Sequence, residues 1–301
     1  MTPSQPPVMK RLPTALDGDE KRRVTELADT PEARKLKVRL AAGYRILARY
    51  GMGQGVAGHI SHRVPGAPDY FWVNPFGLPF GEVTADSMAL VSKRGELVGG
   101  WPLVNYAAFC IHAAIHEARP DVHCAVHTHS PAGSAFSALN TLLQPLDQVC
   151  CSFYEDHAVC SEYEGVVLDP DQTRCMVEAL GGKRALILAN HGLITCAATV
   201  EQAVIDMIDL DRSCQLNLQT MATGQKLQLV PPEAARQARQ VQTTPGRWAF
   251  QWAGLVMELN RHQGDYDPKG WLPHEEVPTV ERVRAALERA RARQEKGAAE
   301  G

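Results

Sequence analysis

The segment PDVHCAVHTHSPAG, residues 120–133, decides how the middle of this chain folds. Pro120 ends the helical pattern before it, and the short apolar run that follows predicts a buried strand over HCAVHTH. Side chains two positions apart on a strand project from the same face, so His127 and His129 can approach one ion together. The pair therefore predicts a metal site carried by a strand.

A second segment, LILANHGLI at residues 186–194, offers a third ligand. His191 follows an apolar strand and precedes Gly192, which permits a tight turn that can present the ring beside the first pair. Three protein ligands leave a coordination position open for substrate or water, as is typical of a catalytic metal. An HxH pair alone arises by chance in a chain with eleven histidines, so the prediction of a divalent metal at His127, His129 and His191 depends on the surrounding sequence.

Working outward, apolar segments and turn signals alternate over residues 29–225, which predicts one principal domain. A helix is predicted from Thr30, a good N-cap residue, to Gly51. The segment ALVSKRGELV, residues 89–98, predicts a hairpin closed by a glycine turn, which implies antiparallel strand pairing. Further helices are predicted over residues 104–118, from Asp169 to Gly181, and from Thr199 to Thr223.

The two ends of the chain differ from this domain. Residues 1–28 combine four prolines with a charged run and show no apolar period, which predicts a disordered N-terminal arm. Residues 226–301 predict a C-terminal helical extension around WAFQWAGLVMEL, followed by an arginine-rich tail. We expect this tail to pack on the domain or to bind a sister subunit.

Composition narrows the class of partner. With 45% hydrophobic residues, 22% charged residues and a net charge of −3, nothing favours nucleic acid or an anionic membrane, so we expect a small-molecule substrate. No apolar run approaches the roughly 20 residues that cross a bilayer, and the N-terminus lacks the apolar core of a secretory signal, which predicts a cytoplasmic protein. The eight cysteines include no CxxC pair and are expected to be reduced and buried.

The two histidine segments together resemble the class II aldolase/adducin head domain family. GHIS at residues 58–61 and VNPFG at residues 73–77 resemble two of its substrate segments, and the resemblance covers about residues 30–225. It implies an α/β fold: a three-layer α/β/α sandwich with a central, largely antiparallel sheet, and a homo-oligomer, often a tetramer, with active sites between subunits. It also implies that the three histidines take the family's metal-ligand positions, with zinc commonest and manganese, magnesium, cobalt or iron known in relatives.

The sequence departs from the sugar-phosphate aldolases of that family in three places. Ala108 stands where they carry the catalytic glutamate, so the usual base is missing. Rings and small groups replace the hydroxyls of their phosphate pocket, which disfavours a phosphate dianion. His59 replaces an asparagine and adds a group able to hold a carboxylate or move a proton near neutral pH. The residues expected to contact substrate are His59, Asn74, Phe76, Gly77 and Tyr106.

These departures predict a metal-dependent lyase, of decarboxylase or aldolase type, for a non-phosphorylated hydroxy or keto acid, aromatic or otherwise hydrophobic. Decarboxylation is favoured because losing carbon dioxide needs no initial base, although a donor must protonate the carbanion afterwards. His59, Tyr154 and His157 are the candidate catalytic residues. A structural role is an equal alternative for the last two, with Tyr154 at a subunit boundary and His157 bonded to the backbone.

Two other classes of function stay open. A three-histidine site can hold iron, so a non-haem iron oxygenase or oxidative decarboxylase on the same scaffold is the first. The second is a non-catalytic oligomerisation module like the adducin head, against which the retained histidine triad argues. His112 and His116, spaced i and i+4 on one helix, are expected to pack and form hydrogen bonds rather than to bind a metal.

Overall fold

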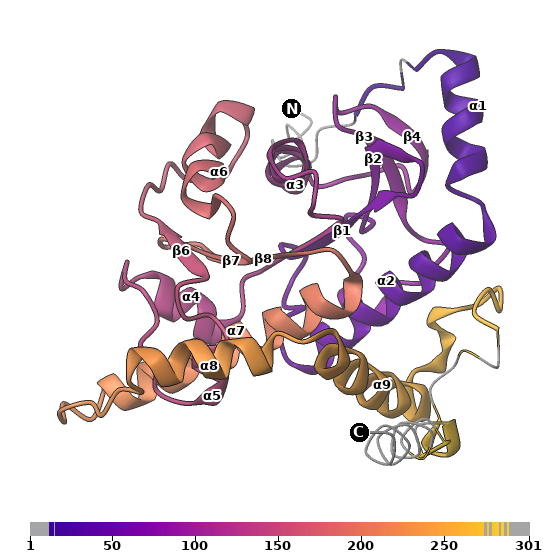
Figure 1. Cartoon of the computed structure of the whole chain (residues 1–301). Coiled ribbons are helices and arrows are strands. Elements are labelled where there is room, and N and C mark those ends of the chain that lie inside the picture. Colours follow the sequence, from indigo (N-terminus) through magenta and orange to yellow (C-terminus); the bar gives the residue numbers. More distant parts are fainter. Residues whose placement is uncertain are drawn as a thin grey trace, which may run out of the picture.

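The computed structural model describes residues 12–14, 16–273, 276, 279–282, 284, 285 and 288 of the 301-residue chain. Within them runs a sheet with the strand order β4-β3-β2-β1-β5-β8-β7-β6 (Figure 1). Neighbouring strands pair antiparallel, apart from β6 and β7, which are parallel. The largely antiparallel sheet predicted from the sequence is confirmed. Its strands are β1 (His59–Val64), β2 (Ala67–Val73), β3 (Ala89–Ser92), β4 (Leu97–Gly100), β5 (Cys124–Thr128), β6 (His157–Cys160), β7 (Ala185–Leu188) and β8 (Gly192–Ala197).

Helices cover both faces of the sheet and give the predicted three layers (Figure 1). One apolar core joins one sheet face to α3 and α6, and a second core joins the other face to α2, α4 and α7. The helices are α1 (Gly18–Leu27), α2 (Pro31–Arg49), α3 (Tyr106–Ala118), α4 (Pro131–Ser137), α5 (Gln148–Cys151), α6 (Arg174–Leu180), α7 (Val200–Met221), α8 (Pro232–Gln242) and α9 (Pro245–His262). Short 3-10 turns are η2 (Phe80–Glu82), η3 (Pro170–Thr173) and η4 (Gly264–Tyr266).

Helix starts follow the capping residues in the sequence. The Thr30 hydroxyl accepts a hydrogen bond from the Ala33 N–H at the start of α2, and Thr199 does the same for Gln202 at the start of α7. Asp169 forms the predicted capping box, but it opens η3, and α6 follows directly. These local signals place the helices that support the sheet.

The N-terminal segment corrects one expectation. The prediction of a disordered arm over residues 1–28 is wrong for Gly18–Leu27, which form α1. Val24 of this helix is fully buried, and Tyr70 of β2 donates a hydrogen bond to Glu20. Residues 20, 24 and 27 are the partly or fully buried positions of the helix and lie at helical spacing, and Leu27 packs against the same core as Val24, so one face of the helix is held against the domain. Residues 1–11 lie outside the described part of the chain.

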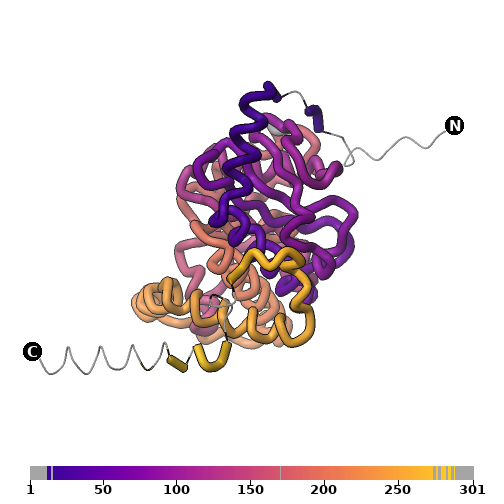
Figure 2. The backbone as a smooth tube through the Cα atoms, turned by 90° about the vertical axis from the view of Figure 1, so that its right-hand side faces the viewer, coloured from indigo at the N-terminus to yellow at the C-terminus, as the bar shows by residue number. Residues whose placement is uncertain are grey.

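The C-terminal extension is helical, as the sequence indicates. Trp252, Val256 and Leu259 of α9 are buried in the core shared with α2 and α7. Figure 2 shows the yellow C-terminal segment lying beside α2, where Arg45 of α2 pairs with Asp265 at 2.6 Å. Of the predicted arginine-rich tail, residues 280–301, only 280–282, 284, 285 and 288 are described, and they are helical. In the part that is described, no helix combines the length and apolar character needed to cross a bilayer.

Two cysteines also depart from expectation. Cys160 at the end of β6 and Cys175 at the start of α6 form a disulfide, with Cα atoms 6.0 Å apart. The expectation that all eight are reduced is wrong for this pair, because β6 and α6 pack together and bring the two ends of the intervening segment into register. The other six cysteines are buried, as predicted.

Candidate metal centre

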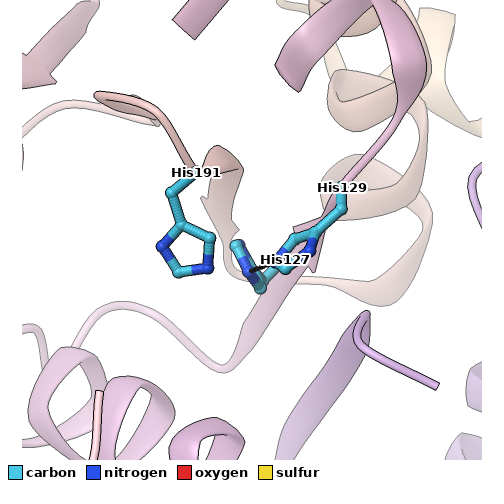
Figure 3. Close-up of side chains that lie close together, drawn as sticks. All are labelled: His127, His129 and His191. Carbon is cyan, nitrogen blue, oxygen red and sulfur yellow. Dashed lines mark hydrogen bonds between the residues drawn. The ribbon is translucent and has the colours of Figure 1, made fainter. Parts of the chain in front are cut away.

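Three imidazoles converge where β5 ends and β8 begins (Figure 3). His127 is in β5, His129 lies just beyond it, and His191 occupies the turn between β7 and β8. The three ring centroids are 4.7 to 4.8 Å apart, and one nitrogen from each ring lies within 4.8 Å of the other two. The structure therefore brings together the three histidines that were predicted from the sequence to be metal ligands.

A tight turn delivers the third ring. Asn190 adopts the left-handed backbone conformation with φ at 54°, which asparagine tolerates better than most residues. At Gly192, an added Cβ would lie 2.4 Å from the carbonyl oxygen of Thr128, so only glycine lets β8 approach β5 this closely. The Asn-His-Gly sequence thus holds His191 against the strand that carries the other two histidines.

Hydrogen bonding and burial leave the histidine rings in a state that can bind a cation. The Nδ1–H of His127 donates to the carbonyl oxygen of Leu193 at 2.9 Å, which leaves the Nε2 of His127 unprotonated and available as a ligand. Burial lowers the pKa of each of the three histidines and is the main cause in each case. The pKa of His127 falls well below its usual value, that of His191 falls to about 4, and that of His129 is also lowered. The triad is therefore neutral near pH 7, the state that binds a metal.

The donor set fits a divalent ion. Nitrogen ligands about 2 Å from a tetrahedral ion are about 3.3 Å apart. The Nε2 atoms of His127 and His129 are 2.8 Å apart, and the remaining ligand separations stay within 4.8 Å, so the observed distances span this value. Neutral imidazoles suit zinc, iron and related ions, and three of them leave coordination positions for a small molecule.

A cavity of about 370 Å³ opens in front of the triad. Its wall carries apolar side chains from four separate segments together with two asparagines, and among the described residues that line it there is neither lysine nor arginine. Besides the metal triad, the lining residues are Val56, Ala57, His59, Phe76, Asn105, Ala107, Ile111, Tyr163, Gly165, Val166, Val167 and Asn190. The site is thus a largely apolar pocket with metal ligands at one end.

A family model described as Class II Aldolase and Adducin N-terminal domain matches residues 38–218. The chain belongs to this family. Members of the class II aldolase group generally depend on a divalent metal, and the histidine triad can hold one here.

Individual relatives differ in what their names describe. Decarboxylase NovR from Streptomyces niveus is 40% identical over 225 residues, which cover 73% of this chain and 83% of that protein. The 4-hydroxy-3-prenylphenylpyruvate oxygenase/4-hydroxy-3-prenylbenzoate synthase from Streptomyces roseochromogenus subsp. oscitans is 39% identical over 232 residues, covering 76% and 83%. The solved structure of L-fuculose 1-phosphate aldolase from Glaciozyma antarctica matches with a TM-score of 0.72 at 36% identity, over 79% of this chain and 95% of that one.

The residues expected to contact substrate divide into two groups. His59 and Phe76 line the cavity. Asn74, Gly77 and Tyr106 are not among its described lining residues. The Asn74 side chain accepts a hydrogen bond from the Tyr44 hydroxyl at 3.1 Å and donates to the Gly58 carbonyl oxygen at 3.4 Å, while the Tyr106 ring packs 5.8 Å from that of Phe109. Binding roles for these three residues remain predictions.

The candidate proton donors Tyr154 and His157 lie away from this cavity. His157 is buried, its Nδ1 donates to the Phe153 carbonyl oxygen at 2.7 Å, and its Nε2 accepts from the Leu143 N–H at 2.9 Å. Both ring nitrogens are therefore engaged by backbone, which matches the structural alternative. The guanidinium of Arg236 lies 5.9 Å from the centre of the Tyr154 ring. Catalytic roles for Tyr154 and His157 stay predictions.

Sequence reasoning missed one wall of the cavity. The segment between β6 and η3 contributes Tyr163, Gly165, Val166 and Val167, and the Tyr163 ring centroid lies 6.5 Å from that of His191. An apolar Val-Val pair after a glycine, inside an otherwise polar stretch, is the signal that could have found this wall. Its position depends on how β6 and α6 pack, which no local pattern encodes.

Proposed function

We propose that this chain is a metal-dependent lyase that decarboxylates a non-phosphorylated hydroxy or keto acid with an aromatic or otherwise hydrophobic body. The observation that carries the proposal is the cavity itself, an apolar pocket that ends on three histidines and has no cationic side chain among its described lining residues. A phosphate dianion is bound best by cationic side chains, and the described wall has no lysine or arginine, whereas a flat apolar group can pack on Phe76, Ile111 and Val166.

The residue at the family's base position supports decarboxylation over aldol cleavage. Ala108 is buried with 1% of its surface exposed, and its methyl group cannot take a proton from carbon. A bound metal supplies Lewis-acid stabilisation for the negative charge that develops on substrate oxygen. The protein then has to bind the apolar body, orient the acid toward the triad and return a proton. Tyr163 is a phenol that lines the cavity, so we add it to the candidate proton donors.

Zinc is the metal that we propose, with manganese, magnesium, cobalt and iron as the other candidates. Three neutral imidazoles, one of them fixed by a backbone carbonyl, are a usual donor set for catalytic zinc. The same set holds iron, and one relative is named as an oxygenase, which supports oxidative decarboxylation as the second candidate function. A non-catalytic, adducin-like role is the third; it predicts no divalent metal binding at micromolar concentration.

We also propose that the chain is a cytoplasmic homo-oligomer, in keeping with the tetramers of the family. Phe250 and Val241 in α9 and α8 are exposed over more than half of their surface, which is consistent with a contact between copies. Sedimentation velocity tests the assembly, and a monomer over the micromolar range would contradict it. Fractionation of the native host tests the location.

The deciding experiment combines elemental analysis of untagged protein with a screen for released carbon dioxide. The panel comprises hydroxybenzoates, keto acids and hydroxypyridine carboxylates, each assayed in air and under anaerobic conditions. Carbon dioxide release that continues without oxygen, with zinc bound, is the expected result. Turnover that requires oxygen, with iron bound, would replace the lyase by the oxygenase. Full metal occupancy with no release from any acid would count against both.

A further inference from the structure

A chain of four polar side chains leads from the cavity into the core. The Nδ1 of His59 lies 2.7 Å from the Nε2 of His112, and the Nδ1 of His112 lies 2.5 Å from the Ser61 hydroxyl. That hydroxyl lies 2.8 Å from the Nε2 of His116, whose Nδ1 is 3.3 Å from the carbonyl oxygen of Val122. All four side chains are buried, with at most 2% of each residue exposed. We call His59, Ser61, His112 and His116 the histidine relay.

The carbonyl at the inner end fixes the direction of every hydrogen bond in the relay. A carbonyl oxygen can only accept, so the Nδ1 of His116 must carry its proton. Burial lowers the pKa of His112 to about 3 and that of His116 well below its usual value, so each of these rings is neutral and carries one proton. The Nε2 of His116 therefore accepts from the Ser61 hydroxyl.

The same rule continues outward to the cavity. The Ser61 oxygen, having donated its proton inward, accepts from the Nδ1–H of His112. With its proton on Nδ1, His112 offers only a lone pair at Nε2, which accepts from the Nδ1–H of His59. A neutral His59 then has no proton on Nε2. Within the described residues this nitrogen has no hydrogen-bond partner, and His59 lines the cavity.

We propose that the histidine relay holds His59 in the Nδ1-protonated tautomer, so that its bare Nε2 accepts a hydrogen bond from a substrate hydroxyl beside the metal triad. His59 pairs with His127 across β1 and β5, and their ring centroids are 4.7 Å apart, which places the acceptor next to a metal ligand. Ser61, His112 and His116 act through His59 and are positioning residues. The assignment of a substrate hydroxyl as the partner of His59 rests on the function proposed above. Of the two substrate classes named there, it favours a hydroxy acid over a keto acid.

This assignment changes the role expected for His59. A bare imidazole nitrogen is an acceptor, and a carboxylate or a keto oxygen is one as well, so neither can form a hydrogen bond with it. The sequence-based expectation that His59 holds a carboxylate therefore gives way to an interaction with a donor. An acid that carries a hydroxyl next to its carboxylate can present both a donor to His59 and oxygens to the triad.

Nitrogen NMR of zinc-loaded protein labelled with ¹⁵N-histidine tests the tautomer, because protonated and bare ring nitrogens have well separated shifts. His59→Asn identifies the His59 signals by their loss. We expect a protonated Nδ1 and a bare Nε2 at pH 7.5; a protonated Nε2 would overturn the proposal. Ser61→Ala should shift His59 toward a mixture of tautomers, whereas Ser61→Thr, which keeps the hydroxyl, should retain the single form. An unchanged tautomer in Ser61→Ala would refute the relay.

Ser213→Ala is the matched control for the relay variants. Ser213 is buried in α7, where its hydroxyl donates to the Asp209 carbonyl oxygen, so this change removes a buried hydroxyl without touching the relay. It should leave the His59 signals unaltered. A His59 tautomer that changes equally in this control would show that the response reports general loosening, and would also overturn the relay.

Calorimetric titration of the zinc-loaded protein tests the substrate part with three probes of similar size. Mandelate carries a hydroxyl donor, whereas O-methylmandelate and phenylglyoxylate do not. We expect mandelate to bind about fivefold more tightly than either analogue, as one hydrogen bond to a neutral group allows, and to lose that preference in His59→Phe or Ser61→Ala. Equal binding, or no binding of mandelate, would overturn the hydroxyl assignment. The release of carbon dioxide is scored separately, so failure of the lyase proposal remains distinguishable.

Discussion

Replacing His127 by alanine should abolish metal binding while leaving the chain folded. His127 is one of the three proposed ligands, it lies in β5 inside the sheet, and 1% of its surface is exposed. In the metal-free protein the change removes the hydrogen bond to the Leu193 carbonyl oxygen and some ring contacts. A loss of about 1–3 kcal/mol follows, which a domain of ordinary stability tolerates.

In the wild type a bound ion should stabilise the fold by an amount similar to this cost. A ligand that binds only the folded state stabilises it by about 2.7 kcal/mol at one hundred times its dissociation constant. Each kcal/mol raises the midpoint of thermal unfolding by roughly 2–4 °C in a protein of about this size, so saturating zinc should raise it by roughly 5–10 °C. His127→Ala should show no such rise.

The assay is thermal unfolding of chelator-treated protein with and without zinc, followed by elemental analysis after desalting. His123→Ala is the matched control, because His123 is an exposed histidine directly before the same strand. This control should keep the full zinc response. The reasoning is refuted if zinc stabilises His127→Ala as much as the wild type. A variant unfolded at 25 °C would show instead that the ion is structural.

Three further changes test the scaffold. Arg184→Met should cost about 3–5 kcal/mol in urea unfolding at pH 7, because it leaves the buried carboxylate of Asp206 without its ion pair at 2.6 Å. Burial raises the pKa of Asp206, and loss of the guanidinium raises it further. The loss in free energy of unfolding should therefore shrink as the pH falls through the pKa of Asp206 in the variant, and a loss that is constant with pH would contradict this. Gly192→Ala should lower stability by about 1–3 kcal/mol and weaken zinc binding, whereas Gly182→Ala, with open space around its Cβ, should change neither in the same titration. Leu259→Ala should cost about 2–5 kcal/mol in the same single unfolding transition if α9 belongs to the main core, and a separate transition would refute that.

The sequence was most informative where one local rule acts alone. Period-two spacing predicted that the rings of His127 and His129 lie together, which they do although His129 is one residue beyond β5, and capping residues located the starts of α2 and α7. The hairpin over residues 89–98 indicated antiparallel pairing, which the strand order confirms. Each of these features depends on neighbours within a few residues, so no knowledge of the rest of the chain was needed.

Features that depend on packing between distant segments were beyond such rules. The cavity wall at residues 163–167 and the Cys160–Cys175 disulfide both follow from the way β6 packs beside α6. The direction of hydrogen bonds through His112 depends on a carbonyl that belongs to another segment. The order of α1 depends on Val24 and Leu27, which pack against a core formed by residues far away in the sequence.

The Cys160–Cys175 bond has a mechanical consequence for access to the pocket. The bond joins the two ends of the segment between Cys160 and Cys175, which carries Tyr163. This segment therefore cannot move away from the cavity about a hinge outside the two cysteines. Widening of the cavity on this side therefore has to come from flexing inside the tethered span, where Gly165, with φ at 90°, is a natural pivot. On this side, access depends on a short tethered loop rather than on the movement of a whole domain.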